Sequence, residues 1–315
     1  MKCIQLTAIK MSVIVLAAAL LSACQSYYAQ PSLSRAELKQ YDFNSLTLKA
    51  GNRINYRVQG ENNQKTLLMV HGGGDSLSVW NRWADQLQQD YRVIRIDMPG
   101  HGLSDPYPDG QYNTVKIADS IGEVVDLLQL NEFVLVAHSY GGEASLHYIQ
   151  RQPDKVKALV LVAPGAYKPE WEDIKDYVES FNQSYLPGKS GVRQSLQIMF
   201  ADPARIGDEI VDYSYDLYQY QPNWGTLQAM EQGSADHYQE VSGTTDIKVP
   251  TLLLWGDQDK VSNLNNIGRR LHREIPDSEL VVYPDVGHMP NYAIATQSVK
   301  DVQKFLKDRV WSINN

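Results

Sequence analysis

The chain has 315 residues, of which 43% are hydrophobic and 21% charged, and its formal net charge is −8 at pH 7. This length is enough for one large hydrophobic core, and the negative charge argues against binding nucleic acid or anionic lipid by electrostatic attraction. The sequence has two cysteines, Cys3 and Cys24, so a chain that has lost its first residues keeps only Cys24. Such a chain has no internal disulfide and no cysteine nucleophile in its body.

The N-terminal segment is typical of a secretory signal. Lys2 and Lys10 precede an apolar run over residues 11–21, which is too short to span a bilayer. The run ends in Leu21-Ser-Ala-Cys24, which resembles the lipobox of bacterial lipoproteins, where cleavage precedes the cysteine and its thiol is lipidated.

This resemblance implies a signal peptide over residues 1–23, lipidation of Cys24, for example with palmitate, and an extracytoplasmic protein anchored to a bacterial membrane. Gln25 is not aspartate, which in a Gram-negative cell implies sorting to the outer membrane. The alternatives are an ordinary signal peptide with a chance cysteine and a signal anchor. The polar residues that follow, to residue 44, are predicted to form a tether (24–44).

The body of the chain alternates strand and helix patterns. A hairpin is expected over 45–58, around Ala50-Gly-Asn52. Strand patterns alternating with helix patterns predict an α/β fold, with a mostly parallel sheet and helices on both faces. Further strands are predicted over 66–70, 92–96, 133–136, 156–163, 249–255 and 280–283, and helices around residues 80–87, 113–128, 143–151, 263–273 and 293–311.

Residues 166–247 interrupt this alternation. They are rich in tyrosine, lack strand patterns, and have helical stretches broken by proline and glycine. We expect a helical cap over the carboxyl ends of the strands, where open α/β sheets bind ligands. The core is then formed by residues 45–165 and 248–315. The cap tyrosines fit either core packing or an aromatic pocket.

A serine flanked by small residues follows the strand at 133–136. Ala137 lies two residues before Ser139, and Gly141 and Gly142 follow it. This small-x-Ser-x-Gly pattern between a strand and a helix is typical of a nucleophile elbow, a turn so sharp that large flanking side chains would collide with the backbone. A glycine-rich turn with an ordinary serine is the alternative.

Two further motifs complete the pattern. The strand at 249–255 is followed by Gly256-Asp-Gln-Asp259, and the last strand by Asp285-Val-Gly-His288-Met-Pro290, which gives the chain order Ser, Asp, His. With these motifs the sequence resembles a capped α/β-hydrolase of the serine hydrolase, esterase-like type over residues 45–311. Five motifs carry the resemblance, in order: His71-Gly-Gly-Gly74, Asp97-x-Pro-Gly-His-Gly-x-Ser104, the elbow, Gly256-Asp-x-Asp259 and Gly287-His-x-Pro290.

The resemblance assigns catalytic roles to three residues. Ser139 is the expected nucleophile, His288 the base that takes its proton, and Asp259 the acid that orients the imidazole. Asp257 is the competing acid and is expected to be a loop residue. For the oxyanion hole we expect the backbone N–H groups of Tyr140 and Gly73, with Gly74 as a weaker candidate.

Other conspicuous residues have structural interpretations. His71, His101 and His138 lie beside motifs and are expected to pack loops, and Asp97 and Ser104 to pin the loop that follows their strand. No spacing of His, Cys, Asp or Glu suggests a metal site. The chemistry of a serine hydrolase needs no cofactor.

The leading hypothesis is a lipid-anchored serine hydrolase that cleaves carboxylic esters (EC 3.1.1) through an acyl-enzyme. We expect a monomer that acts on a small-molecule ester, does not bind nucleic acid, and contacts the membrane through Cys24. Carbon–carbon bond hydrolases and amidases or aminopeptidases use the same fold and remain alternatives. A binding protein that keeps the fold without catalysis is the rival from another class.

Overall fold

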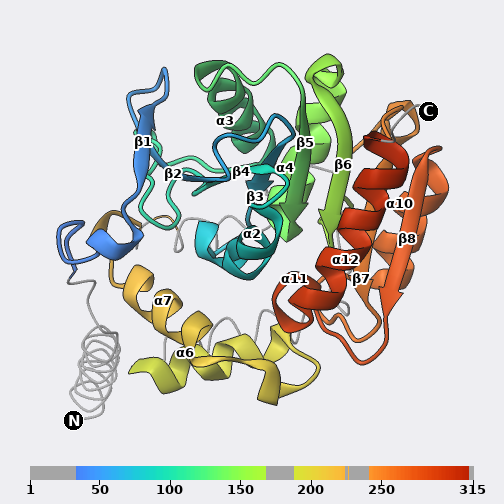
Figure 1. Cartoon of the computed structure of the whole chain (residues 1–315). Coiled ribbons are helices and arrows are strands. Elements are labelled where there is room, and N and C mark those ends of the chain that lie inside the picture. Colours follow the sequence, from blue (N-terminus) through green and yellow to red (C-terminus); the bar gives the residue numbers. More distant parts are fainter. Residues whose placement is uncertain (1–32, 168–187, 224–225, 227–240, 312–315) are drawn as a thin grey trace, which may run out of the picture.

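The computed structural model describes residues 33–167, 188–223, 226 and 241–311. Eight strands form one sheet in the spatial order β1-β2-β4-β3-β5-β6-β7-β8 (Figure 1). The first two strands of this order are antiparallel to their neighbours, and the other six run parallel. In chain order the strands are β1 (Asn44–Thr47), β2 (Arg53–Gln59), β3 (Thr66–Val70), β4 (Arg92–Ile96), β5 (Phe133–His138), β6 (Val156–Val162), β7 (Thr251–Gly256) and β8 (Ser278–Tyr283).

Helices cover both faces of the sheet, as predicted. The central strands β3, β5 and β7 are buried along their whole length, which explains why they read as continuous apolar runs. Alternate residues face opposite sides: Leu68 and Val70 belong to the core beneath α3 (Thr114–Leu127) and α4 (Ser139–Arg151), and Leu67 and Met69 to the core beneath α2 (Asn81–Leu87) and α12 (Ala295–Phe305).

The predicted helices have the expected places, but α4 begins earlier than predicted, at Ser139, and the last two predicted helices are divided into shorter parts. Helix α3 begins after Asn113, whose side chain accepts a hydrogen bond from the Lys116 backbone N–H and caps the helix. The helix predicted over 263–273 is a π-helical turn, Leu264–Gly268, followed by α10 (Arg269–Glu274). The last helical pattern divides into α11 (Pro290–Ala293), α12 and a second π-helical turn at Leu306–Val310. Hydrophobic periodicity does not distinguish a π-helical turn from an α-helix, so the sequence does not predict these two turns.

Part of the predicted cap is described. Helices α6 (Gly188–Leu196) and α7 (Asp208–Tyr218) lie below the carboxyl ends of the parallel strands in Figure 1. Two short 3₁₀ turns, Gln197–Met199 and Pro203–Arg205, connect them. Residues 168–187, 224–225 and 227–240 of the cap lie outside the described residues, as do the signal peptide and Cys24.

The second part of the segment predicted as a tether packs on the body. Leu38 is 1% exposed, and Leu33 pairs with Tyr220 at the end of the described cap. Arg35 donates hydrogen bonds to the Asp105 carboxylate (2.7 Å) and the Tyr220 hydroxyl (2.9 Å). These contacts hold residues 33–41 against both the cap and the loop after β4.

Candidate active site

Ser139 stands at the turn between β5 and α4. Its φ of 49° is in the left-handed region, which is costly for a residue with a side chain and is held only by strong surrounding constraints. The two following glycines supply those constraints. A Cβ atom on Gly141 would come within 2.1 Å of the His71 carbonyl oxygen, and one on Gly142 within 2.6 Å of Pro164 Cβ. The turn is therefore as tight as the sequence pattern predicts.

The parallel strands bring the other two residues to the same edge. Asp259 follows β7 and His288 follows β8, and His288 Nδ1 lies 2.8 Å from Asp259 Oδ2. Both side chains are buried, with exposed fractions of 1% for His288 and 0% for Asp259. The other oxygen, Oδ1, accepts hydrogen bonds from the backbone N–H groups of Val261 (2.8 Å) and Ser262 (2.9 Å). The carboxylate is thus held in one orientation from both sides.

This arrangement fixes the chemistry of the imidazole. Because a carboxylate can only accept, Nδ1 of His288 carries the proton, and Nε2 of the neutral ring carries a lone pair. Nε2 is buried and has no hydrogen-bond partner among the described residues. The ring of His138, the residue before Ser139, lies 4.7 Å from the His288 ring between centroids. The structure therefore joins Asp259 to His288 directly and brings the imidazole beside the elbow, although no hydrogen bond links it to Ser139 in the described part of the chain.

Asp257 has a different environment from Asp259. It is exposed, and its carboxylate accepts a hydrogen bond from the backbone N–H of Asp285 at 2.9 Å. This contact ties the loop after β7 to the loop after β8. The geometry is that of a loop residue, as expected.

The glycine-rich loop after β3 borders the elbow. A Cβ atom on Gly72 would lie 3.1 Å from Ser139 Cβ and 2.8 Å from His138 Nδ1. The loop then turns at once, because the Asp75 N–H donates to the Gly72 carbonyl at 3.3 Å and Gly74 has a φ of 72°. Gly73, a predicted oxyanion donor, follows Gly72, which borders Ser139. It precedes Gly74, whose positive φ only glycine adopts without strain.

The three histidines near the motifs pack loops, as expected. His71 is fully buried, its Nδ1–H donates to the Gly72 carbonyl (2.7 Å), and its Nε2 accepts from the Met98 backbone N–H (3.0 Å). His138 Nε2–H donates to the His288 carbonyl at 3.0 Å. Burial lowers the pKa of both rings well below the ordinary value, and for His138 the neighbouring His288 contributes to the same effect.

Asp97 and Ser104 fix the loop after β4, also as expected. The Asp97 carboxylate accepts from the backbone N–H groups of Leu77 (2.7 Å) and Leu103 (2.9 Å) and from Asn55 Nδ2 (2.7 Å). The Ser104 hydroxyl donates to the Asp97 carbonyl at 2.7 Å. Burial still raises the pKa of Asp97 to about 6, because these donors only partly replace water.

The sequence interpretation missed one contact between the cap and the site. The backbone N–H of His288 donates to the carbonyl of Met199, in the turn after α6, at 2.8 Å. Gly287 fits against the same segment, since a Cβ atom there would lie 2.5 Å from the Met199 carbonyl oxygen. No motif signals this contact, because any residue at position 199 offers a carbonyl.

Among the residues that the structure describes, no group of three or more His, Cys, Asp or Glu side chains lies close enough to hold a metal ion. Of the helices in the described ranges, none combines the length and apolar character needed to cross a bilayer.

The sequence profile of the α/β hydrolase fold family matches residues 65–190 and 192–292. The chain belongs to the α/β-hydrolase fold family. Its sheet and the succession of Ser139, Asp259 and His288 after three parallel strands agree with this family. The chain is accordingly a hydrolase of the α/β-hydrolase superfamily.

Individual relatives of this α/β-hydrolase include enzymes of different chemistry. A 2-hydroxy-6-oxononadienedioate/2-hydroxy-6-oxononatrienedioate hydrolase from Comamonas testosteroni is 26% identical over 248 residues, which are 75% of this chain and 85% of that protein. Two solved structures share the fold, each with 22% identity. They are a meta-cleavage product hydrolase from Pseudomonas fluorescens (TM-score 0.75, 85% of this chain and 99% of that one) and an esterase from Exiguobacterium antarcticum (TM-score 0.71, 84% and 99%).

Proposed function

We propose that this hydrolase cleaves carboxylic esters through an acyl-enzyme formed on Ser139. The observation that carries the proposal is the 2.8 Å contact between His288 Nδ1 and Asp259 Oδ2, which leaves Nε2 as a buried lone pair beside the strained serine turn. A lone pair in that position is what a general base needs.

In the proposed reaction the Ser139 hydroxyl attacks the ester carbonyl while its proton passes to His288 Nε2. The imidazolium that forms is stabilised by Asp259, and it returns the proton to the departing alcohol. A water molecule then attacks the acyl-enzyme, again with His288 as the base, and releases the acid. The backbone N–H groups of Gly73 and Tyr140 would bind the negative charge on the carbonyl oxygen, each contributing roughly 3 kcal/mol.

A second candidate function is hydrolysis of a carbon–carbon bond. It is favoured by the relative from Comamonas testosteroni, whose name describes a hydrolase of dienedioate compounds. Both reactions use the same nucleophile and base, so the choice depends on which group the cap admits.

A panel of substrates separates the two functions. Purified protein would be assayed with 4-nitrophenyl esters of graded acyl length, one anilide, and one 2-hydroxy-6-oxodienoate. The proposal predicts turnover of at least one ester that is lost in Ser139→Ala. Turnover of the dienoate but of no ester would show that the enzyme cleaves a carbon–carbon bond and not an ester.

We further propose that the protein is lipid-anchored at Cys24 outside the cytoplasm. The support is the sequence Leu21-Ser-Ala-Cys24 behind an apolar run. Expression with radiolabelled palmitate in a bacterium tests this proposal. Label should enter the wild-type protein, and label retained by Cys24→Ser would contradict it.

A further inference from the structure

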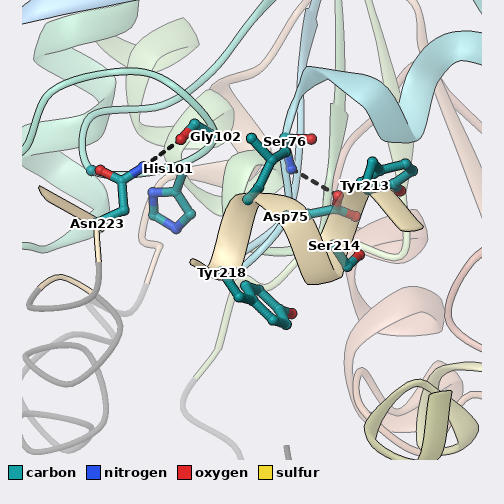
Figure 2. Close-up of a pocket in the computed structure, with 11 residues that line it drawn as sticks. Asp75, Ser76, His101, Gly102, Tyr213, Ser214, Tyr218 and Asn223 are labelled. Carbon is teal, nitrogen blue, oxygen red and sulfur yellow. Dashed lines mark hydrogen bonds between the residues drawn. The ribbon is translucent and has the colours of Figure 1, made fainter. Parts of the chain in front are cut away.

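A pocket lies between the first glycine-rich loop, the loop after β4 and cap helix α7. Figure 2 shows its lining, with His101 and Gly102 to the left of α7 and Asp75 beside Tyr213 and Ser214. The lining side chains are small, aromatic or uncharged, with one acid among them. They are Gly74, Asp75, Ser76, Gly100, His101, Gly102, Tyr213, Ser214, Leu217, Tyr218 and Asn223.

Asp75 is the carboxylate of this pocket. Its Oδ1 accepts a hydrogen bond from the Ser76 backbone N–H at 2.7 Å, and in Figure 2 it lies beside Tyr213 and Ser214 of α7. No Lys or Arg of the described residues forms an ion pair with it. Loss of water raises the pKa of Asp75 to about 7; the Ser76 N–H and the Tyr213 hydroxyl oppose this rise, and the charge of Asp97 adds to it. A carboxylate that has lost solvating water is strongly stabilised in its charged form by a positively charged neighbour.

His101 supplies a second acceptor. It is 2% exposed, and its Nδ1–H donates to the Pro99 carbonyl at 3.0 Å. Burial lowers the pKa of His101 to about 4, so the ring is neutral at pH 7 and Nε2 carries a lone pair. That atom is buried and has no hydrogen-bond partner among the described residues. The pocket thus presents two acceptors from two different loops, and a group with an N–H donor and a positive charge satisfies both.

The pocket is within reach of a substrate bound at Ser139. A Cβ atom on Gly72 would lie 3.1 Å from Ser139 Cβ, and the turn Gly72–Asp75 is closed by a hydrogen bond of 3.3 Å. Such a turn keeps its first and last Cα atoms within about 7 Å of each other. A group three to five bonds from the scissile carbonyl can therefore extend to Asp75 while the carbonyl stays at the serine.

We propose that this pocket binds a protonated amine of the substrate, with its N–H donated to His101 Nε2 and its positive charge against the Asp75 carboxylate, and that the enzyme prefers amine-bearing esters over neutral ones. The proposal rests on the proposed hydrolysis at Ser139 and names its substrate class.

A matched pair of esters tests the preference. 3-(Dimethylamino)propyl acetate and 4-methylpentyl acetate have the same shape, but only the first carries a protonated nitrogen at pH 8. The proposal predicts a kcat/KM roughly 10- to 100-fold higher for the amine ester, the range expected for hydrogen bonds to a charged group. Asp75→Asn should bring this ratio close to one. Asp212→Asn removes the same charge from an exposed position on α7, where Asp212 pairs with Lys189, and should keep the ratio.

A binding measurement separates this inference from the proposed function. Calorimetry with N,N-dimethylpentylammonium and the Ser139→Ala protein requires no turnover, and Asp75→Asn should weaken binding at least tenfold. Thermal melting confirms that each variant is folded. Amine binding that depends on Asp75, with neither ester hydrolysed, would support the pocket and reject the ester reaction. Equal turnover of both esters, or amine binding unchanged by Asp75→Asn, would overturn the pocket assignment.

Discussion

The backbone N–H of His288 is hydrogen-bonded to the Met199 carbonyl at 2.8 Å. Met199 belongs to the cap, and His288 follows the last strand of the core, so the proposed base is positioned partly by the cap. A second link lies nearby. The Arg82 guanidinium stacks 3.7 Å from the centre of the Tyr292 ring, and Phe200, next to Met199, meets the same ring edge-on at 5.9 Å. The segment after α6 therefore helps to position the loop that carries His288.

Gly287→Ala tests this link. An added Cβ atom would lie 2.5 Å from the Met199 carbonyl oxygen and 2.8 Å from the Ala201 nitrogen, so either the cap or the loop that carries His288 must move. A displacement of about 1 Å at a catalytic group costs roughly 100-fold in rate. We expect a fall of that order in kcat/KM, measured with the best ester of the panel. In the control, Gly122→Ala, the new Cβ has ordinary contact with Tyr148 at 3.5 Å, and kcat/KM should be unchanged.

Replacing each of the two acids after β7 by asparagine distinguishes their roles. Asp259→Asn replaces the acceptor of the His288 Nδ1–H and favours the wrong tautomer, so kcat should fall roughly 10⁴-fold. Asp257→Asn alters an exposed carboxylate that bonds only to a backbone N–H in the described contacts, and kcat should stay within about twofold. Steady-state kinetics at one pH measure kcat of both variants for this comparison. A larger loss at position 257 would move the acid assignment.

The raised pKa of Asp75 predicts an unusual dependence of stability on pH. Below about pH 4 the carboxyl is protonated in both the folded and unfolded states and has no effect. Between about pH 4 and 7 the folded state keeps a proton that the unfolded state has lost, so stability falls as pH rises. Above pH 7 the penalty is constant.

Asp75→Asn removes this penalty because an amide does not ionise. The free energy of unfolding of the variant, relative to wild type, should increase by roughly 4 kcal/mol between pH 4 and pH 8. Urea denaturation at the two pH values measures the difference. A variant whose relative stability is the same at both would show that Asp75 ionises normally. Asp97 and Tyr213, which face Asp75, and the neighbouring His101 are present in both proteins, so their own titration largely cancels.

Much of the fold was predictable because each feature has a local cause. The continuous apolar runs of β3, β5 and β7 follow from burial on both faces, and the glycines after Ser139 follow from the closeness of His71 and Pro164. The edge of the sheet where Ser139, Asp259 and His288 meet follows from parallel strand direction alone. Each of these features has its own short sequence pattern: an apolar run, the small residues around Ser139, or an acid or a histidine after a strand.

The features that sequence reasoning missed arise from contacts between distant segments. Asp75 reads as a loop residue after three glycines, but α7, more than a hundred residues later, lines the same pocket and helps to shield it from water. The contact of Met199 with His288 involves two backbone groups and has no side-chain signature. In the segment predicted as a tether, Leu38 and Arg35 are held by partners far along the chain, including Asp105 and Tyr220.

The central claim is that Ser139 is an activated nucleophile, and covalent labelling tests it most directly. Purified protein would be incubated with a fluorophosphonate and the modified peptide located by mass spectrometry. The account predicts one adduct per chain, on Ser139, formed quickly in wild type, slowly in His288→Ala and never in Ser139→Ala. A folded wild-type protein that gives no adduct, or one that is labelled at another residue while Ser139 stays unmodified, would contradict the account.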